Sequence, residues 1–572
     1  MSFFDKLKKE HIVAQPGFNR WKVPPASLAI HLCIGSVYAW SIYNPALISL
    51  NGVADSASTD WSLRQVVWIF SVSIVFLGLA AAFGGKWLEK VGPRMVGLTS
   101  ATCWGGGYLI GALGIWTHQL WLLYLGYGVI GGVGLGLGYV SPVSTLIRWF
   151  PDRRGMATGL AIMGFGGGAL IGAPLKEYLL RAFYESPEYL GPVAEQTLRT
   201  IDGVQYVQVN GDWQETIIMG PRDISEMRIP GEPGAYLAGT GKSGAFETFL
   251  ILGLAYFFIM CLAAFAFRVP PPNWKPEGWI PPTGESASKK MMTHAHVHMD
   301  TALKTPQFYL LWVVLCFNVT AGIGVLSVAR NMMTEIFGDA LPHIVTGGFA
   351  ATYVGAISVF NMLGRFFWAS TSDYLGRKTT YNIFFILGLL LYLIIPLLAW
   401  LAGINFAILW LVLFYAVTML IFTLYGGGFA TIPAYLADVF GTRHVGAIHG
   451  RLLTAWSTAG VLGPVAITAL RERSLKRAID QVASQVEPDT FKATFGESVE
   501  QLPTLVERGT VTLSRLMEIA PEGVRDPSNT LYNSTMFLMA GLLGIALVCN
   551  LTMRPVHPKY HWDEKDHPPP SA

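Results

Sequence analysis

The stretch Val359-Phe-Asn-Met-Leu-Gly-Arg365-Phe-Phe-Trp-Ala-Ser-Thr-Ser-Asp373-Tyr-Leu-Gly-Arg-Lys378 places one arginine inside an apolar helical run. The run ends in a turn that carries an acidic residue, a glycine and two basic residues. An arginine inside a membrane segment costs about 2.5–3.5 kcal/mol to insert. No Asp or Glu lies within the following two turns, and Asn361, one turn earlier, offers only an uncharged amide. We therefore interpret Arg365 as the counter-ion of a bound anion.

The composition is that of a membrane protein. Of 572 residues, 52% are hydrophobic and only 13% are charged, whereas soluble domains carry about 25% charged residues. Sixty-two glycines suit close contacts between membrane helices. No basic cluster is interleaved with aromatic residues, so nucleic-acid binding is not expected. The five cysteines show no metal-ligand spacing, and we expect neither a metal nor a cofactor.

Hydropathy predicts about twelve membrane segments of about 20 residues each. In chain order these lie near Pro25–Leu50, Ser62–Phe83, Met95–Thr117, Trp121–Leu146, Gly155–Leu180, Phe246–Phe267, Phe308–Ala329, Thr346–Ser370, Tyr381–Leu401, Phe406–Leu436, Leu452–Leu470 and Leu531–Met553.

Short-loop charges predict the orientation. Lysine and arginine follow the second, fourth and eighth segments, whereas the short loops after the first and third segments, 51–60 and 117–119, contain none. By the positive-inside rule both termini are expected in the cytoplasm, with the chain spanning a bacterial inner membrane several times.

The second half of the chain repeats the first. Gly85-Lys-Trp-Leu-Glu89-Lys-Val-Gly-Pro-Arg94 follows the second segment, and the Asp373–Lys378 turn follows the eighth. Two six-helix halves of the same direction make a parallel repeat. The predicted parts are an N-terminal segment 1–24, a first bundle 25–268 with an outer insert 181–243, a linker 269–305, a second bundle 306–553 with an outer insert 471–530, and a tail 554–572.

Both inserts are expected outside the cell, where they would pack together as a small cap. In the first, alternating apolar and polar residues flank Asn210-Gly211, which predicts a two-residue β-hairpin. The second begins with helical spacing at Leu475, Ala478, Ile479 and Val482.

The turns after segments two and eight resemble the signature of the major facilitator superfamily. Within it, the chain resembles the oxalate–formate antiporter family and, more distantly, the monocarboxylate transporters. The motifs that carry this likeness are Gly35-Ser-Val-Tyr38-Ala-Trp40-Ser, Arg148-Trp-Phe-Pro-Asp-Arg-Arg-Gly-Met-Ala-Thr-Gly159, Phe360-Asn-Met-Leu-Gly-Arg365 and Tyr425-Gly-Gly-Gly-Phe-Ala-Thr-Ile-Pro433. The resemblance implies an all-α fold of two six-helix bundles around a cavity that opens alternately to each side.

The resemblance also implies roles for individual residues. Arg365 matches a substrate-binding arginine, Tyr38 and Tyr139 match phenols that line the cavity, and Tyr425 matches a cavity tryptophan. Oxalate-transporting members carry a lysine where this chain has Trp456. One cavity cation balances one negative charge, and an unpaired second carboxylate in a desolvated site is costly. This favours a monocarboxylate over oxalate. A structural or snorkelling role for Arg365 is the alternative.

Proton coupling and gating rest on fewer residues. Asn361 occupies the place of an aspartate that the monocarboxylate transporters hold one turn before their arginine. His31 lies seven residues before Tyr38, on the same helical face, and histidine is the side chain type that can exchange a proton near neutral pH. It is a candidate proton carrier, although a packing histidine is the alternative. Proton symport and anion exchange both stay open. Gating candidates at helix ends, where charge pairs can form and break, are Glu89, Arg94, Asp373 and Arg377.

We therefore predict a monomeric secondary transporter of small monocarboxylates such as formate, lactate, pyruvate or glycolate. Its partners would be a proton or a counter-anion and the lipid bilayer. The alternatives are an anion exchanger of the oxalate–formate type and a non-transporting carboxylate sensor on the same fold. No nucleophile–base set or metal cluster suggests an enzyme.

Overall fold

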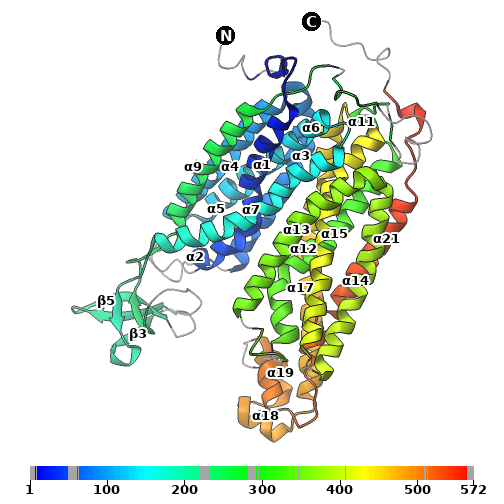
Figure 1. Cartoon of the computed structure of the whole chain (residues 1–572). Coiled ribbons are helices and arrows are strands. Elements are labelled where there is room, and N and C mark those ends of the chain that lie inside the picture. The colour runs from blue at the N-terminus through cyan, green and yellow to red at the C-terminus, as the bar shows by residue number, and fades with distance from the viewer. Residues whose placement is uncertain are drawn as a thin grey trace. The chain divides into compact units, whose positions relative to one another are not determined.

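The computed structural model describes residues 7, 9–48, 61, 63–201, 204–219, 231–272, 274–280, 292–293, 295–338, 340–345, 347–405, 407–495, 497–507, 511 and 513–562. The chain divides into two compact units (Figure 1). Unit 1 comprises Met1–Thr305, Pro433–Ser457 and Val556–Ala572, and unit 2 comprises Pro306–Ile432 and Thr458–Pro555. The units do not coincide with the two sequence halves, because Pro433–Ser457 belongs to unit 1.

Unit 1 is a helical bundle with a small sheet at one end (Figure 1). Its helical elements are η2 Lys9–Ile12, η3 Arg20–Lys22, α1 Val23–Gly35, η4 Ser36–Tyr43, α2 Asn44–Ile48, α3 Leu63–Val91, α4 Pro93–Trp116, α5 Leu120–Leu123, η6 Tyr124–Gly131, α6 Gly132–Trp149, α7 Arg154–Ala182, η7 Val193–Glu195, α9 Ala245–Ala266, α11 Met299–Ala302, α16 Val445–Leu452 and η10 Pro558–Tyr560. Within it, α4 packs along α9, α1 along α7, and α3 against α6 and α16.

Unit 2 is built of long helices. They are α12 Pro306–Phe337, α13 Gly347–Leu375, α14 Arg377–Asn405, α15 Ile408–Phe440 up to Ile432, α17 Thr454–Ala483 from Thr458 on, and α21 Asn533–Leu551. Shorter elements are α18 Pro488–Phe495, η8 Val499–Gln501, α19 Leu502–Glu507, α20 Leu513–Glu518 and η9 Pro527–Thr530. The helix α21 packs against α14 and α12.

The predicted helical membrane fold is confirmed. Ten helices of the described part are long and apolar enough to cross a membrane, and they match ten of the predicted segments. The other two predicted segments correspond to the helices α4 and α13. The helix α4 is rich in glycine, serine and threonine, and α13 carries Arg365 and Asp373.

Two of the membrane segments are not regular α-helices. The first changes after α1 into the 3₁₀ segment η4, with a non-helical backbone at Ala39. The fourth contains the π-helical segment η6 between α5 and α6. At Gly126 in η6, an added Cβ would lie 2.7 Å from the carbonyl oxygen of Gly107 on α4. The close approach of two helix backbones at glycine therefore accompanies the wider helical turn.

The insert of unit 1 folds as antiparallel sheets. Five strands follow the order β2-β6-β5-β4-β3, with β2 Tyr189–Gly191, β3 Leu198–Ile201, β4 Val204–Val209, β5 Asp212–Met219 and β6 Gly234–Leu237. A separate pair joins β1 Tyr184–Glu185 to β7 Lys242–Ser243. The predicted hairpin is confirmed: Val209 pairs with Asp212, and Asn210 and Gly211 have φ angles of 55° and 96°. Two positive φ angles are what a two-residue hairpin turn of this kind requires.

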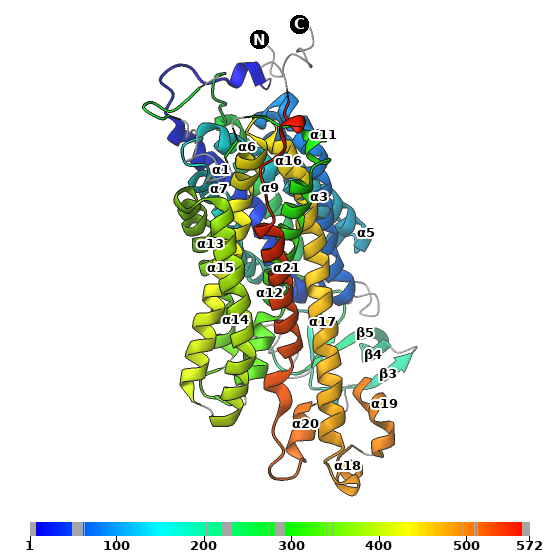
Figure 2. The same ribbon diagram turned by 90° about the vertical axis from the view of Figure 1, so that its right-hand side faces the viewer.

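The insert of unit 2 is helical. Its predicted helical spacing is confirmed, but the residues continue α17 rather than start a new helix (Figure 2). Ala478, Ile479 and Val482 are buried there. Because the two inserts belong to different units, their packing into one cap stays a prediction.

The segment Pro433–Ser457 packs tightly on unit 1 through small residues. A Cβ added to Gly450 of α16 would lie 2.0 Å from the carbonyl oxygen of Ala81 on α3. A Cβ on Gly85 would lie 2.7 Å from the Cα of Ala447. The Ser457 hydroxyl donates to the carbonyl oxygen of Ile74 at 2.8 Å. Residues of the second sequence half thus complete the core of unit 1.

Candidate functional site

In unit 2, helix α13 buries the guanidinium of Arg365 completely. Its Nε donates to Oδ1 of Asn361 at 3.1 Å, one turn earlier on the same helix. The guanidinium carbon lies 5.3 Å from the ring centre of Phe429 on α15, a cation–π distance. Glycines permit this approach of α13 to α15. A Cβ on Gly364 would lie 2.4 Å from the carbonyl oxygen of Thr423, and a Cβ on Gly426 2.3 Å from that of Asn361.

Tyr425 belongs to the same unit and is also buried. Its ring lies against Gly322 of α12, where an added Cβ would be 2.1 Å from a ring carbon. Tyr425 lies within α15, directly before Gly426, whose added Cβ would meet Asn361. Unit 2 therefore brings Arg365, Asn361 and Tyr425 into one region.

In unit 1, the other predicted aromatic residues form a cluster around Phe165. The ring centres of Tyr38, Tyr139 and Trp456 lie 5.1, 5.6 and 5.3 Å from that of Phe165. Trp456 lies 5.4 Å from Tyr139 and 6.4 Å from Tyr38. Tyr139 and Trp456 are fully buried, and Tyr38 is partly exposed. Sequence reasoning missed Phe165, because a phenylalanine in a membrane segment carries no chemical signature.

His31 lies beside this aromatic cluster. Its side chain is fully buried, and Nδ1 lies 3.1 Å from the carbonyl oxygen of Ser27. Its ring meets that of Tyr139 edge-on at 5.3 Å. The ring of His449 from α16 also lies near that of Tyr139, at 5.8 Å. The histidine at position 449 was missed because it lies 418 positions after His31, so no local pattern joins them.

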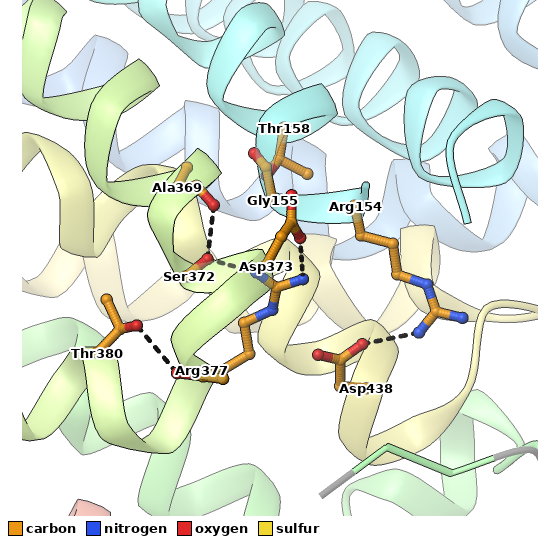
Figure 3. Close-up of polar contacts among 10 residues, drawn as sticks. Arg154, Gly155, Thr158, Ala369, Ser372, Asp373, Arg377, Thr380 and Asp438 are labelled. Carbon is orange, nitrogen blue, oxygen red and sulfur yellow. Dashed lines mark hydrogen bonds and ion pairs between the residues drawn. The ribbon is translucent and has the colours of Figure 1, made fainter. Parts of the chain in front are cut away.

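Charged residues gather at the C-terminal ends of α3, α6 and α15 and at the N-terminal ends of α4 and α7. The carboxylate of Glu89 accepts a hydrogen bond from Arg148. Arg154 donates to Asp438 at 2.7 Å, with side chains only 10% and 4% exposed (Figure 3). Arg94 donates instead to two carbonyl oxygens, those of Phe265 and Phe267, at 3.1 and 3.2 Å. Of the predicted gating residues in unit 1, Glu89 therefore lies in an ion pair and Arg94 ties α4 to the end of α9.

The corresponding turn of unit 2 holds the other two predicted gating residues. Arg377 donates to Asp373 at 2.6 Å and also to the hydroxyl of Ser372 (Figure 3). Gly376 between them has a φ of 82°. This conformation favours glycine and lets α13 end and α14 begin within one residue.

A buried lysine was missed. Lys176 of α7 is fully buried, and its ammonium donates to the carbonyl oxygens of Ser36 and Ala39 at 2.6 and 3.4 Å. The same nitrogen lies 4.6 Å from the ring centre of Tyr43. These carbonyls belong to η4, where the first segment departs from α-helix. The sequence offered a signal, because the predicted segment Gly155–Leu180 contains this lysine.

Comparison with known proteins agrees with this architecture. The chain matches the Major Facilitator Superfamily over residues 32–190 and 234–464. The oxalate:formate antiporter of Oxalobacter formigenes is 26% identical over 456 residues, which cover 78% of this chain and 83% of that protein. The apicoplast pyruvate carrier 1 of Toxoplasma gondii is 25% identical over 466 residues, 74% of this chain and 78% of that protein.

Solved structures share the fold. The E. coli fucose:proton symporter FucP superposes with a TM-score of 0.52 at 10% identity, covering 93% of this chain and 99% of that one. The human organic anion transporter MFSD10 gives a TM-score of 0.51 at 11% identity, with coverage of 94% and 100%.

The fold and the buried polar residues define a multi-span membrane transport protein. The chain belongs to the Major Facilitator Superfamily. It is a secondary transporter, and family membership confirms the expectation that it is not an enzyme.

Proposed function

We propose that this transporter carries small monocarboxylates, such as formate, lactate, pyruvate or glycolate, by alternating access. The observation that carries the proposal is the complete burial of the Arg365 guanidinium in α13, beside Asn361 and the ring of Phe429. A guanidinium grips a carboxylate through two parallel hydrogen bonds, which strengthen where water is excluded. Asn361 accepts a hydrogen bond from Nε of Arg365 and so helps to orient the guanidinium.

The charge of the substrate follows from the cations of the site. Where oxalate-transporting relatives are expected to hold a lysine, this chain has Trp456, which packs on Phe165. The buried lysine of unit 1, Lys176, is engaged by the carbonyls of Ser36 and Ala39. Arg365 then balances a single carboxylate. Tyr38, Tyr139, Trp456 and Tyr425 would supply phenol donors and the apolar surface for the rest of a small substrate.

Two relatives support this substrate class, since one is named an oxalate:formate antiporter and the other a pyruvate carrier. The first also supports a second candidate, anion exchange, in which one carboxylate leaves as another enters. Both candidates use Arg365 in the same way. They differ in whether a proton or a second anion accompanies transport.

Alternating access requires contacts that break when one side of the protein opens. We assign this role to the ion pairs Glu89–Arg148 and Arg154–Asp438 and to the Asp373–Arg377 turn. Two of these contacts join the first sequence half to the second. Arg154 pairs with Asp438, and Arg148, the partner of Glu89, also donates to the carbonyl oxygen of Arg443. We place these ends and both termini in the cytoplasm from the loop charges.

Uptake into proteoliposomes tests the proposal. Purified protein is reconstituted and preloaded with one unlabelled carboxylate, and entry of the same radiolabelled carboxylate is measured at equal pH on both sides. This counterflow needs no net driving force. The expected result is counterflow for at least one monocarboxylate and none for oxalate with wild-type protein.

The variant Arg365→Ala should abolish counterflow, and Arg365→Lys should lower it at least tenfold, because an ammonium keeps the charge but loses the fork. Arg199→Ala, in the exposed strand β3, is the matched control and should transport like wild type. Undiminished counterflow in Arg365→Ala would overturn the assignment. Binding without counterflow in wild-type protein would indicate a sensor instead of a carrier.

A further inference from the structure

Two buried histidines lie beside one tyrosine in the core of unit 1. His31 of α1 and His449 of α16 are 0% and 1% exposed, and the ring of Tyr139 lies 5.3 Å from the first and 5.8 Å from the second. These three side chains are called the imidazole cluster below.

The histidines belong to different halves of the sequence. His31 lies in the first membrane segment, and His449 lies in the segment Pro433–Ser457, which packs on unit 1 although it belongs to the second half. The contact of α16 with α3 is close, because a Cβ added to Gly450 would lie only 2.0 Å from the carbonyl oxygen of Ala81. A motion that lifts α16 from α3 and α6 would move His449 away from Tyr139 and His31 and could admit water between them.

From this arrangement we propose that the imidazole cluster is the proton-binding site of a proton-coupled carboxylate carrier, an inference that rests on the function proposed above. While α16 is packed, a positive charge in the cluster lacks hydration and would repel a second one. Once α16 has moved away, water can stabilise an imidazolium on either residue. Proton binding and the motion of α16 are then thermodynamically linked, and linkage acts in both directions.

We assign proton binding to the two histidines and not to the charged groups on the neighbouring elements. The titratable side chains on the elements that pack against α1, α6 and α16 include Lys86, Glu89 and Lys90 on α3, Arg94 and Tyr108 on α4, Arg148 on α6, Arg154, Lys176, Glu177, Tyr178 and Arg181 on α7, Glu247 and Tyr256 on α9, Asp300 on α11, Arg20 and Lys22 on η3, Tyr43 on η4, and Tyr124 and Tyr127 on η6. Arg148 pairs with Glu89, Arg154 with Asp438, and Asp300 with Arg451 of α16. Lys86 is exposed, and Lys176 is engaged by backbone carbonyls.

Because one imidazole charge disfavours the other, the cluster holds one proton per cycle. One proton moving with one monocarboxylate gives electroneutral symport. The coupling therefore predicts accumulation driven by a pH gradient and indifferent to membrane potential.

The test compares two assays on the same reconstituted protein: counterflow at equal pH, and accumulation of the same labelled monocarboxylate driven by an acidic exterior. In His31→Gln and His449→Gln, accumulation should fall at least tenfold while counterflow stays within twofold of wild type. The matched control is His444→Gln, one residue before α16 and outside the cluster, which should retain both activities.

The outcomes separate the two proposals. No counterflow with any monocarboxylate in wild-type protein overturns the proposed function and this inference with it. Wild-type counterflow without a response to the pH gradient, or accumulation that survives in both glutamine variants, overturns this inference alone. This inference is also overturned if a glutamine variant keeps the wild-type unfolding temperature but loses both counterflow and accumulation.

If a glutamine variant does not fold, the wild-type protein provides the measurement. Carboxylate is added to purified protein in weak buffer with a pH-indicator dye. Proton uptake or release on substrate binding supports the linkage, whereas binding without any proton exchange between pH 5.5 and 8 overturns it.

Discussion

Arg154 and Asp438 lie 284 positions apart in the sequence and form a buried ion pair, with 2.7 Å between Nη1 and Oδ1. Arg154 opens α7 in the first sequence half, and Asp438 lies near the end of α15 in the second. Their side chains are only 10% and 4% exposed. The Arg154–Asp438 pair can form only while the segment Pro433–Ser457 is packed on the rest of unit 1. Loss of the pair therefore indicates loss of that packing.

Replacement of one partner should weaken this packing strongly. In Asp438→Asn the guanidinium of Arg154 stays in place without its carboxylate, and loss of one partner of a buried pair costs about 3 kcal/mol or more. The double variant Arg154→Gln/Asp438→Asn should be less destabilised than Asp438→Asn alone, since it leaves no buried charge. Thermal unfolding of the purified variants measures both effects. Equal unfolding temperatures for Asp438→Asn and wild type would contradict the prediction.

Glycine at position 450 should be required for the contact between α16 and α3. In Gly450→Ala, the new methyl would lie 2.0 Å from the carbonyl oxygen of Ala81, so α16 must move outward. We expect a lower unfolding temperature and at least a tenfold loss of transport. Gly106→Ala in α4 is the matched control, because no atom lies within 4 Å of its added Cβ. The control should match wild type in both assays, and similar behaviour of the two variants would refute the close contact.

Lys176 should stabilise the departure of the first segment from α-helix. In Lys176→Met the carbonyls of Ser36 and Ala39 lose their buried donor, which costs about 1–3 kcal/mol. Lys492→Met, on the exposed surface of α18, removes a lysine without burial and serves as the control. Thermal unfolding is again the measurement. A variant at position 176 as stable as its control would show that the ammonium has no structural role.

His444 should make stability depend on pH. Burial, together with the neighbouring charges of His298 and Arg443, lowers the pKa of His444 from 6.5 to about 4. A lowered folded-state pKa gives stability that is complete above pH 6.5 and declines as the pH falls toward 4, because the unfolded chain binds the proton first.

Between pH 7.5 and 5.5 this effect is about 1 kcal/mol or less, since the ring is partly solvated. His444→Gln should therefore lose less stability than wild type over this interval. The comparison is the difference in unfolding temperature at the two pH values. A wild-type protein and a variant with parallel pH dependence would rule out this role for the histidine.

Several predictions from the sequence depended on short stretches of chain and were confirmed. The hairpin at Asn210-Gly211 follows from the φ angles that the two residues adopt, and the helical continuation through Ile479 and Val482 follows from their spacing. The burial of Arg365 was predicted from its place in an apolar run. Each of these depends on interactions within a few residues, which the order of the amino acids displays directly.

Short stretches of sequence could not predict three other features. These are the imidazole cluster, the Arg154–Asp438 pair and the contacts of Lys176. His449 and Asp438 reach unit 1 because glycines at 85, 446 and 450 allow α16 and the end of α15 to pack on α3 and α6. The sequence shows these glycines but not which backbone each one meets. The sequence repeat divides the chain at the linker 269–305 and therefore predicts Pro433–Ser457 in the second half. The structure instead groups this segment with unit 1.

The amino-acid sequence alone determined a helical membrane protein with repeated halves, a buried arginine in α13 and the class of transporter it resembles. Hydrophobic length, helical period and turn chemistry are local, so they can be read along the chain. Only the tertiary structure decided which distant residues the buried polar groups meet: Arg365 with Phe429, Lys176 with Ser36, and Tyr139 with His31 and His449. Such contacts join residues far apart in the chain, and they are selected by how closely two helices can approach.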